Sequence, residues 1–355
     1  MKDHGINTAF LLLATKTYKL VIKPLAMIKV ENLSKTFKVH QKAAGLKESI
    51  KSLFFRKWIE KKALDNVSFQ IRPGELVGLI GANGAGKTTL VKILSGIIHS
   101  SGGQVSVLGF NPWDRKNEFR KQISLIMGQK AQLWWDLPAE DCFLLLKEIY
   151  EIPNDQYKAT LKELVDALDV AHVMNIQIRR LSLGERMKME LIAALLHQPK
   201  VVFLDEPTIG LDITAQKSIR KFILEYRKRH KPIMILTSHY MEDIKKLCER
   251  ILIIKNGELK YDGDLNKILD QYREDKIITV HLDPDKPTTD FEMEKSELVA
   301  KENATLKYKV AKGNEGAALT EIFRKLDVVD VKIEEDDIAN IIEKLIKREP
   351  TGRGL

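Results

Sequence analysis

One segment of this 355-residue chain constrains its fold more than any other. A short apolar run at residues 75–80 leads into Gly-Ala-Asn-Gly-Ala-Gly-Lys-Thr at residues 81–88, and a helical pattern follows. Such a run is typical of a strand buried in a parallel sheet. The loop between strand and helix matches G-x-x-x-x-G-K-[ST], a pattern that binds phosphate groups. The sequence therefore predicts an α/β domain with a phosphate-binding loop.

This loop offers several kinds of phosphate ligand. Glycines permit backbone angles that a Cβ forbids, so successive N–H groups can surround an anion. The positive end of the helix that begins at Lys87 points at the same anion. Lys87 is expected to reach the β- and γ-phosphates, and the Thr88 hydroxyl to bind Mg²⁺. The expected nucleotide contacts here are Gly81, Ala82, Asn83, Gly84, Ala85, Gly86, Lys87, Thr88 and Thr89.

A second apolar run ends on two acids. Residues 201–204 are Val-Val-Phe-Leu, and Asp205 and Glu206 follow directly. In proteins with a phosphate loop, an acid at the end of a neighbouring buried strand holds Mg²⁺, so Asp205 is the expected metal ligand. Glu206 is placed to polarise or orient the attacking water as a general base.

Ser182-Leu183-Gly184-Glu185 precedes Asp205 by about twenty residues and begins a helix, with Ser182 as its expected N-cap. In this arrangement the chain closely resembles the ATP-binding cassette ATPases, whose Leu-Ser-Gly-Gly-Gln signature stands at the same place. The resemblance covers about residues 27 to 265. It implies that two cassettes enclose two ATP molecules head to tail, with Ser182 and Gly184 facing the γ-phosphate bound by the other cassette.

The resemblance also assigns roles to four further residues. Gln129 looks like the Q-loop glutamine, which senses Mg²⁺ and faces the membrane partner. Asp212, in Gly-Leu-Asp, looks like the D-loop acid that bridges the two cassettes. His239 looks like the switch histidine that contacts the γ-phosphate. Phe37 stands where the family stacks an aromatic ring on adenine, although an ordinary core phenylalanine is an open alternative.

The signature itself departs from the family pattern at two positions. Leu183 replaces the first glycine and Glu185 replaces the terminal glutamine. Glu185 adds a negative charge near an anionic phosphate, which is unfavourable unless Arg186 or Lys188 compensates. We expect this departure to tune nucleotide affinity rather than abolish it.

The expected fold is an ABC-type P-loop ATPase domain, with a mixed sheet core and a helical subdomain, followed by a small α+β domain. Residues 1–26 form an extension that is disordered or not native, because strand-like sequence begins at about Met27. Residues 27–265 are expected to form the ATPase domain, and residues 266–355 a small accessory domain of ferredoxin-like type that carries no catalytic constellation. The elements expected are strands at 64–71, 75–80, 201–204 and 233–236 and helices at 140–150, 158–169 and 213–229.

Composition excludes some classes of protein. The two cysteines lie far apart and form neither a disulfide framework nor a zinc motif, which fits a reducing cytosol. No apolar run approaches the ~18 residues that a membrane-spanning helix needs. The net charge of +9 is explained by lysine-rich solvated faces, and no nucleic acid is expected as a partner.

These features predict an ATP-binding and ATP-hydrolysing subunit, a homodimer or heterodimer with a second ATPase subunit, at the cytoplasmic face of the membrane. Its expected cofactors are ATP and Mg²⁺, and it would power transport, in the export direction, through separate integral membrane permease subunits. One alternative is a polysaccharide-type exporter ATPase, suggested by a basic amphipathic helix expected within residues 38–62. A soluble non-transport cassette and a regulatory nucleotide-binding module are the others.

Overall fold

The computed structural model describes residues 28–40, 58–128, 130–272, 275–284 and 296–335. The expected N-terminal extension, the start at Met27 and Gln129 lie outside these ranges, as do residues 41–57 of the basic stretch. The description below concerns the remaining residues.

The central sheet carries the strand order β5-β6-β7-β3-β8-β9. Neighbouring strands run parallel except β8 and β9, which form an antiparallel pair. Its strands are β3 (Leu76–Ile80), β5 (Ile123–Met127), β6 (Val201–Asp205), β7 (Ile233–Thr237), β8 (Arg250–Lys255) and β9 (Glu258–Asp264). Because β3, β6 and β7 are buried on both faces, they read as continuous apolar runs in the sequence.

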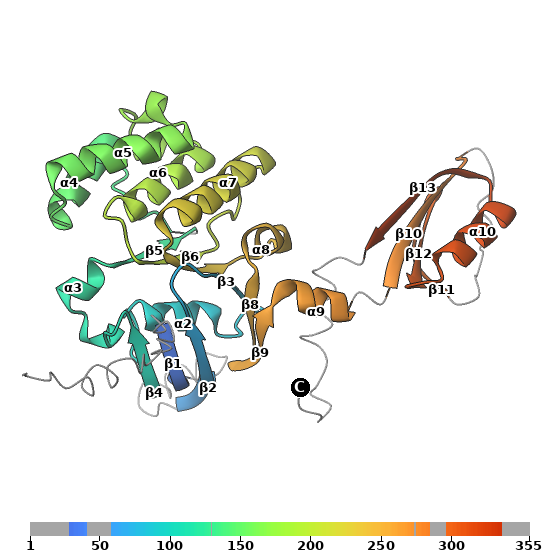
Figure 1. Cartoon of the computed structure of the whole chain (residues 1–355), viewed down its shortest axis with the longest axis horizontal. Coiled ribbons are helices and arrows are strands. Elements are labelled where there is room, and N and C mark those ends of the chain that lie inside the picture. Colours follow the sequence, from blue (N-terminus) through green and yellow to red (C-terminus); the bar gives the residue numbers. More distant parts are fainter. Residues whose placement is uncertain (1–27, 41–57, 129, 273–274, 285–295, 336–355) are drawn as a thin grey trace, which may run out of the picture.

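An antiparallel sheet with the order β2-β1-β4 forms a second layer. Its strands are β1 (Ile28–His40), β2 (Trp58–Ile71) and β4 (Gly102–Val107), and the neighbouring helices are α2 (Lys87–Leu94), a 3₁₀ turn (Pro112–Asp114) and α3 (Asn117–Arg120). Helix α2 lies between the two sheets (Figure 1), and its apolar side chains share one buried cluster with residues of β1, β2, β6 and β7. Val201 and Phe203 of β6 point into this cluster.

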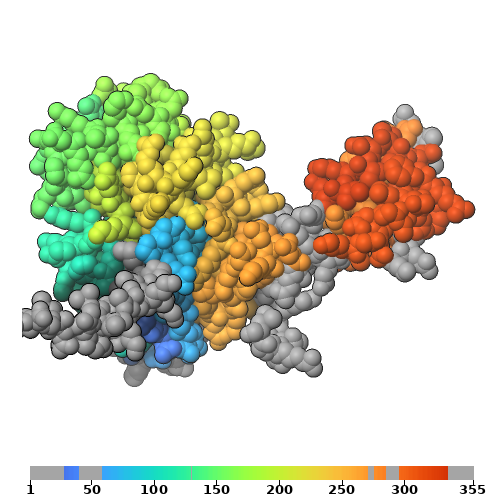
Figure 2. All heavy atoms as spheres, viewed as in Figure 1, coloured from blue at the N-terminus to red at the C-terminus, as the bar shows by residue number. Residues whose placement is uncertain are grey.

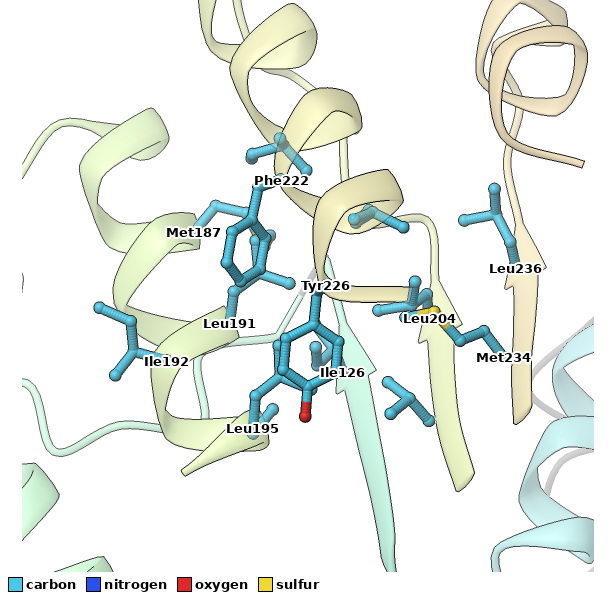
Figure 3. Packing of buried hydrophobic residues seen from close by; sticks show 14 of the residues in the cluster. Ile126, Met187, Leu191, Ile192, Leu195, Leu204, Phe222, Tyr226, Met234 and Leu236 are labelled. Atoms are coloured by element: carbon cyan, nitrogen blue, oxygen red, sulfur yellow. The ribbon is translucent and has the colours of Figure 1, made fainter. Parts of the chain in front are cut away.

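The alternate residues of the same strand, Val202 and Leu204, point to the opposite side and pack under a layer of helices. This layer contains α4 (Ala139–Ile149), α5 (Asn154–Leu168), α6 (Leu183–Leu195), α7 (Ile213–His230) and α8 (Met241–Leu247), with 3₁₀ turns at Ala171–Val173 and Ile178–Arg180. Figure 3 shows side chains of α6 and α7 meeting those of the sheet. Within the described ranges, each helix is too short or too polar to cross a bilayer.

Helix α9 (Leu265–Tyr272) belongs to the unit built around the central sheet and not to the smaller C-terminal unit described below. Its Leu265, Ile268 and Leu269 are buried in the cluster beneath the helical layer. The boundary expected after residue 265 is therefore too early, because these apolar side chains lose contact with water only against the ATPase core.

A smaller sheet, with the order β11-β12-β10-β13, follows and has its own buried cluster. Its elements are β10 (Asp275–Leu282), β11 (Ser296–Glu302), β12 (Thr305–Ala311), α10 (Glu315–Lys325) and β13 (Val328–Glu335). Helix α10 joins strands that flank β10 on either side, the split βαβ arrangement of ferredoxin-like domains. In Figures 1 and 2 this unit stands apart from the first.

Several predicted elements are confirmed. The strands expected at 75–80, 201–204 and 233–236 are β3, β6 and β7. Ser296–Glu302, in a charged stretch without a strand-like apolar pattern, form β11, because this strand gains its hydrogen bonds from β12. At the two ends of the basic stretch, residues 38–40 and 58–62 continue the β1–β2 ladder. The apolar residues between them that predict an amphipathic helix lie outside the described residues.

A half-buried histidine follows α6. One ring nitrogen of His197, Nε2, lies 3.0 Å from the carbonyl oxygen of Ile123, and the ring stacks on Tyr150 at 3.9 Å. Burial lowers the pKa of His197 to about 4, because the charged imidazole loses its hydration there. The ring is therefore neutral in the folded chain at neutral pH.

This shift predicts a pH dependence of stability. In the unfolded chain His197 titrates near about 6.5, so between that value and about 4 the unfolded state binds more protons than the folded state. The free energy of unfolding therefore decreases as pH falls through this window. Between about pH 7.5 and 5.5 the loss from His197 is about 1 kcal/mol, and His197→Gln should remove it, as measured by urea denaturation. Equal pH dependence in both proteins would contradict this origin.

Candidate functional site

The phosphate loop, residues 81–86, connects β3 to α2 in a conformation that its glycines make possible. Gly84 and Gly86 have φ of 79° and 116°, in the region that side chains with a Cβ rarely adopt. A Cβ on Gly86 would lie 2.5 Å from the carbonyl oxygen of Ala63, and one on Gly81 would lie 2.3 Å from that of Ile254. Close backbone contacts thus determine the conformation of the loop. In this conformation its amides and the first turn of α2 are available to bind an anion.

Lys87 is the first residue of α2, and its side chain turns back over the loop. Its ammonium donates hydrogen bonds to the carbonyl oxygens of Gly81, at 2.6 Å, and Ala82, at 3.2 Å. Burial lowers the pKa of Lys87, while the nearby carboxylates of Glu206 and Asp205 oppose that shift. The cation is therefore held inside the loop, beside two acids. Thr88, next along the helix, is exposed.

Asp205 ends β6, and Thr237 pairs with it at the end of β7. The Thr237 hydroxyl donates a hydrogen bond to Asp205 Oδ1 at 2.6 Å. Carboxyl ends of parallel strands meet at one edge of a sheet, which is where ligands bind in open α/β folds. Asp205 thus lies at the same edge as the phosphate loop that follows β3, with one carboxylate oxygen oriented by a neighbouring strand.

Glu206 follows Asp205 with a φ of 58°, which is unusual for a residue with a Cβ. Its backbone N–H donates to the carbonyl oxygen of Thr237, at 3.0 Å, and lies 3.1 Å from the hydroxyl of the same residue. The carboxylate oxygen Oε1 lies 2.7 Å from Nε2 of His239. The Glu206 side chain is largely buried, whereas that of His239 is 42% exposed. The two side chains are in close contact, near the ammonium of Lys87.

The segment before Gln129 contacts the backbone of Asp205 and Glu206. The Gly128 N–H donates to the carbonyl oxygen of Asp205 at 2.9 Å. A Cβ on Gly128 would lie 2.0 Å from the carbonyl oxygen of Glu206, so only glycine permits this approach. Gln129 itself lies outside the described residues, and its role remains a prediction.

Phe37 lies on β1 near the loop. Lys35, two residues before it, pairs with Leu64 of β2, whose Cδ2 would be 2.8 Å from a Cβ on Gly86. The Lys35 ammonium sits 4.9 Å from the centre of the Phe37 ring. The ring is half-buried, outside the buried clusters, so it is not an ordinary core phenylalanine.

Ser182 caps α6, as expected, and Glu185 completes a capping box. The Glu185 carboxylate accepts hydrogen bonds from the Ser182 N–H, at 2.9 Å, and the Ser182 hydroxyl, at 2.7 Å. These bonds lower the pKa of Glu185. Arg186 is one of the two cations expected to compensate the Glu185 charge, and its guanidinium lies over the Trp135 ring. His172 and Lys188 also lower the pKa of Glu185, and the Lys188 ammonium donates a hydrogen bond to the Leu168 carbonyl oxygen.

The start of α6 packs against the start of α7 in the same chain. A Cβ on Gly184 would meet the Cβ of Ala215 at 3.1 Å, and one on Gly210 would meet Leu183 at 3.3 Å. Asp212 caps α7 by accepting the Ala215 N–H at 2.9 Å. The residues expected to serve the second nucleotide thus gather at two adjacent helix starts.

Sequence patterns did not single out the polar residues that support the site. Besides Thr237, a buried group surrounds Asp243, which lies in the first turn of α8. The Thr-Ser pair directly before His239 was the available signal, because small hydroxyl residues are uncommon at the end of a buried strand. Nothing in the local sequence links Asp243 to its partners, which come from other elements.

Comparison with known proteins agrees with this geometry. The family model described as ABC transporter matches residues 64–209. The ABC transporter ATP-binding protein NatA of Bacillus subtilis is 32% identical over 216 residues, which are 61% of this chain and 87% of that protein. The doxorubicin resistance ATP-binding protein DrrA of Mycobacterium tuberculosis is 31% identical over 206 residues, 58% of this chain and 62% of that protein.

Solved structures share the fold. The ATP-binding subunit of an ABC transporter has a TM-score of 0.57 and 24% identity, covering 69% of this chain and 93% of that one. A dimeric, post-hydrolysis ATP-binding cassette bound to ADP and Pi has a TM-score of 0.56 and 22% identity, covering 67% and 99%. With the sequence relatives, these findings show that the chain belongs to the ABC transporter ATP-binding proteins and is an ATP-hydrolysing subunit of a transporter.

Proposed function

We propose that this chain hydrolyses ATP with the residues gathered at the edge of the central sheet and couples that reaction to export through separate membrane permease subunits. The observation that carries the catalytic part is the Glu206–His239 pair, 2.7 Å apart beside the buried Lys87. The relative named for doxorubicin resistance supports the export direction. The membrane partner and the direction are the finer parts of this proposal.

In this proposal, the phosphate loop and Lys87 bind the phosphates of ATP. Lys87 exchanges its bonds to the loop carbonyls for the β- and γ-phosphates, since these oxygens carry full charge. The first turn of α2 adds N–H donors. Thr88 and Asp205 would hold Mg²⁺, which supplies charge stabilisation for the phosphate oxygens when bound. The oxygen ligands at these two positions are those that Mg²⁺ prefers.

Hydrolysis needs a water oriented in line with the bond that breaks. The water oxygen attacks the γ-phosphorus, the bond to the β–γ bridging oxygen breaks, and the carboxylate of Glu206 takes the proton of the water. His239 donates its Nε2–H to Glu206 and so holds the carboxylate in place. The unusual backbone angle of Glu206 is maintained by the bonds that Thr237 makes with its N–H.

Two copies of the chain would complete each site. The starts of α6 and α7, with Ser182, Gly184 and Asp212, are carried by the helical layer, whereas the phosphate loop follows a strand of the central sheet. In a head-to-tail pair, each α6 start would face the γ-phosphate on the other chain. A helix N-terminus with a serine cap is a suitable donor for that anion.

One exposed apolar surface supports the part of the proposal that concerns a membrane subunit. Large exposed apolar side chains gather between the Gln129 segment and the end of α4: Trp134, Trp135, Leu144, Leu145 and Ile149. We call this set the 134–149 surface. The Trp134 carbonyl oxygen lies 3.7 Å from the Cys142 thiol, so the tryptophan segment runs beside α4. Helix α4 is at the outer edge of the helical layer, in green in Figures 1 and 2. Such clustered apolar exposure is typical of protein contacts.

Replacing the catalytic glutamate tests the sandwich and the chemistry together. Glu206→Gln should lower ATP turnover by about a hundredfold or more, because an amide cannot take the proton, while ATP binding stays intact. The bound nucleotide should then hold two chains together, so light scattering after gel filtration with Mg-ATP should show a dimer.

Lys87→Ala serves as the matched control for that experiment. Loss of the phosphate-facing cation should cost roughly a thousandfold in turnover and should also prevent the ATP-dependent dimer of Glu206→Gln. A Glu206→Gln protein that stays monomeric with ATP would remove the support for the sandwich. Turnover at the wild-type rate would show that Glu206 is misassigned.

The charge at Glu185 should weaken the dimer. Glu185→Gln keeps an oxygen that can accept the Ser182 N–H, so the cap of α6 is preserved while the negative charge disappears. In the Glu206→Gln background, this change should lower the ATP concentration needed for dimerisation, read from the light-scattering mass against ATP. An unchanged or higher concentration would refute the role of the charge.

The membrane partner can be captured from detergent-solubilised native membranes with tagged Glu206→Gln protein. Mass spectrometry should find a multi-span membrane protein in similar amount. Trp135→Glu, at a side chain that is 52% exposed, should abolish this recovery because it charges the 134–149 surface. Val329→Glu, at an exposed apolar position of β13, is the control and should leave it intact. Recovery of ribosomal or DNA-bound proteins alone would overturn the transport role.

A further inference from the structure

A buried ion pair lies between α7 and α8. Arg220 Nε donates a hydrogen bond to Asp243 Oδ1 at 2.6 Å, and Asp243 has no exposed surface while Arg220 is 9% exposed. Removing both charges from water costs several kcal/mol, and apolar residues in such places are often equally stable. Stability alone therefore does not account for this pair.

The second oxygen of Asp243 binds the two segments that carry the catalytic pair. Asp243 Oδ2 accepts hydrogen bonds from the hydroxyls of Ser238, at 2.6 Å, and Thr208. Ser238 directly precedes His239, and its Oγ also accepts the N–H of Tyr240 at 3.0 Å. The Ser238 side chain thus binds the chain on both sides of His239. Thr208 stands two residues after Glu206, so Asp243 connects the backbone at both members of the pair.

Arg220 extends the same network toward the turn at residues 210–212. Its Nη2 donates to Gln216 Oε1 at 2.9 Å, and Gln216 Nε2 donates to the carbonyl oxygen of Leu211 at 3.0 Å. Leu211 directly precedes Asp212, the cap of α7. A continuous series of hydrogen bonds therefore runs from the neighbours of His239 through Asp243 and Arg220 to this turn.

We propose that Asp243 and Arg220 form a buried positioning unit, which holds the Glu206–His239 pair in a fixed geometry relative to the 210–212 turn. Neither residue touches the nucleotide; both act through the segments they bind. The carboxylate suits this task because its two oxygens accept three donors from three elements, which an apolar side chain cannot do. The proposal rests on the roles proposed above for Glu206 and His239.

Through this unit, a displacement of the 210–212 turn would change the geometry of the Glu206–His239 pair. The turn lies beside the start of α6, where Leu183 would contact a Cβ on Gly210 at 3.3 Å. Contact with a second chain at that place would shift the turn. Short, buried hydrogen bonds whose donors and acceptors are already paired transmit such a shift, because these groups have few alternative partners.

Isosteric changes at the two hydroxyls test the proposal without introducing an unpaired charge. Thr208→Val removes the donor to Asp243 and keeps the shape, whereas Thr208→Ser keeps the donor and removes a methyl group. We expect kcat for ATP to fall between about tenfold and a hundredfold in Thr208→Val and in Ser238→Ala, with KM little changed. Thr208→Ser should keep kcat near that of the wild type, even though loss of its methyl group leaves a cavity that Thr208→Val does not create.

Thr160→Val is the matched control for a lost buried hydroxyl. Thr160 is 2% exposed on α5, and its Oγ1 accepts a hydrogen bond from Gln198 at 2.8 Å. This variant should lower the unfolding midpoint but leave kcat unchanged. Because Thr208 and Ser238 act through the same carboxylate, the double variant Thr208→Val/Ser238→Ala should lose less than the product of the single losses.

Two results would overturn the positioning unit. One is wild-type kcat in both Thr208→Val and Ser238→Ala; the other is an equal loss of kcat in Thr208→Val and Thr208→Ser. Glu206→Gln separates this failure from failure of the proposed function. If Glu206→Gln is inactive while Thr208→Val is active, only the positioning unit falls. If Glu206→Gln turns over ATP at the wild-type rate, the catalytic assignment falls, and the positioning unit falls with it.

Discussion

The register of three parallel strands is the constraint on which the site depends. Strand β7 lies between β6 and β3, and Thr237 at its end pairs with Asp205 on one side and with Leu79 on the other. This register sets the end of the acid-bearing strand level with the start of the phosphate loop. A slip of one residue in any of these strands would turn its buried side chains to the opposite face. The apolar side chains on both faces therefore hold the catalytic geometry in place.

Those side chains serve two different layers. In β6, Val201 and Phe203 pack toward α2, while Val202 and Leu204 pack toward the helical layer. The phosphate loop is fixed from the α2 side, through close contacts of its glycines with β2 and β8. The starts of α6 and α7 are fixed from the other side. The same strand thus supports both halves of the proposed nucleotide site.

Polar groups supply what packing cannot. The Thr237 hydroxyl hydrogen-bonds to the Asp205 carboxylate at 2.6 Å and to the Glu206 N–H at 3.1 Å, and His239 Nε2 lies 2.7 Å from the Glu206 carboxylate. Beneath them Asp243 joins the segments on which they stand. At the α6 start, the Ser182–Glu185 capping box has a similar role. The Glu185 carboxylate accepts hydrogen bonds from donors that would otherwise be available to an external anion. The chain thereby places a negative charge at the helix start that we propose faces a phosphate of the second chain.

The sequence by itself determined the phosphate loop, the acid pair at 205–206, the serine cap at 182 and the buried strands around them. These are local patterns: glycine freedom, apolar runs and capping depend on residues close together in the chain. It did not reveal that β11 is a strand, that α9 belongs to the first core, or that residues 58–62 extend β2, because each depends on partners far away in the chain. Only the tertiary structure brought Thr208, Arg220 and Ser238 to Asp243, since a buried charge is stable only where donors from separate elements converge.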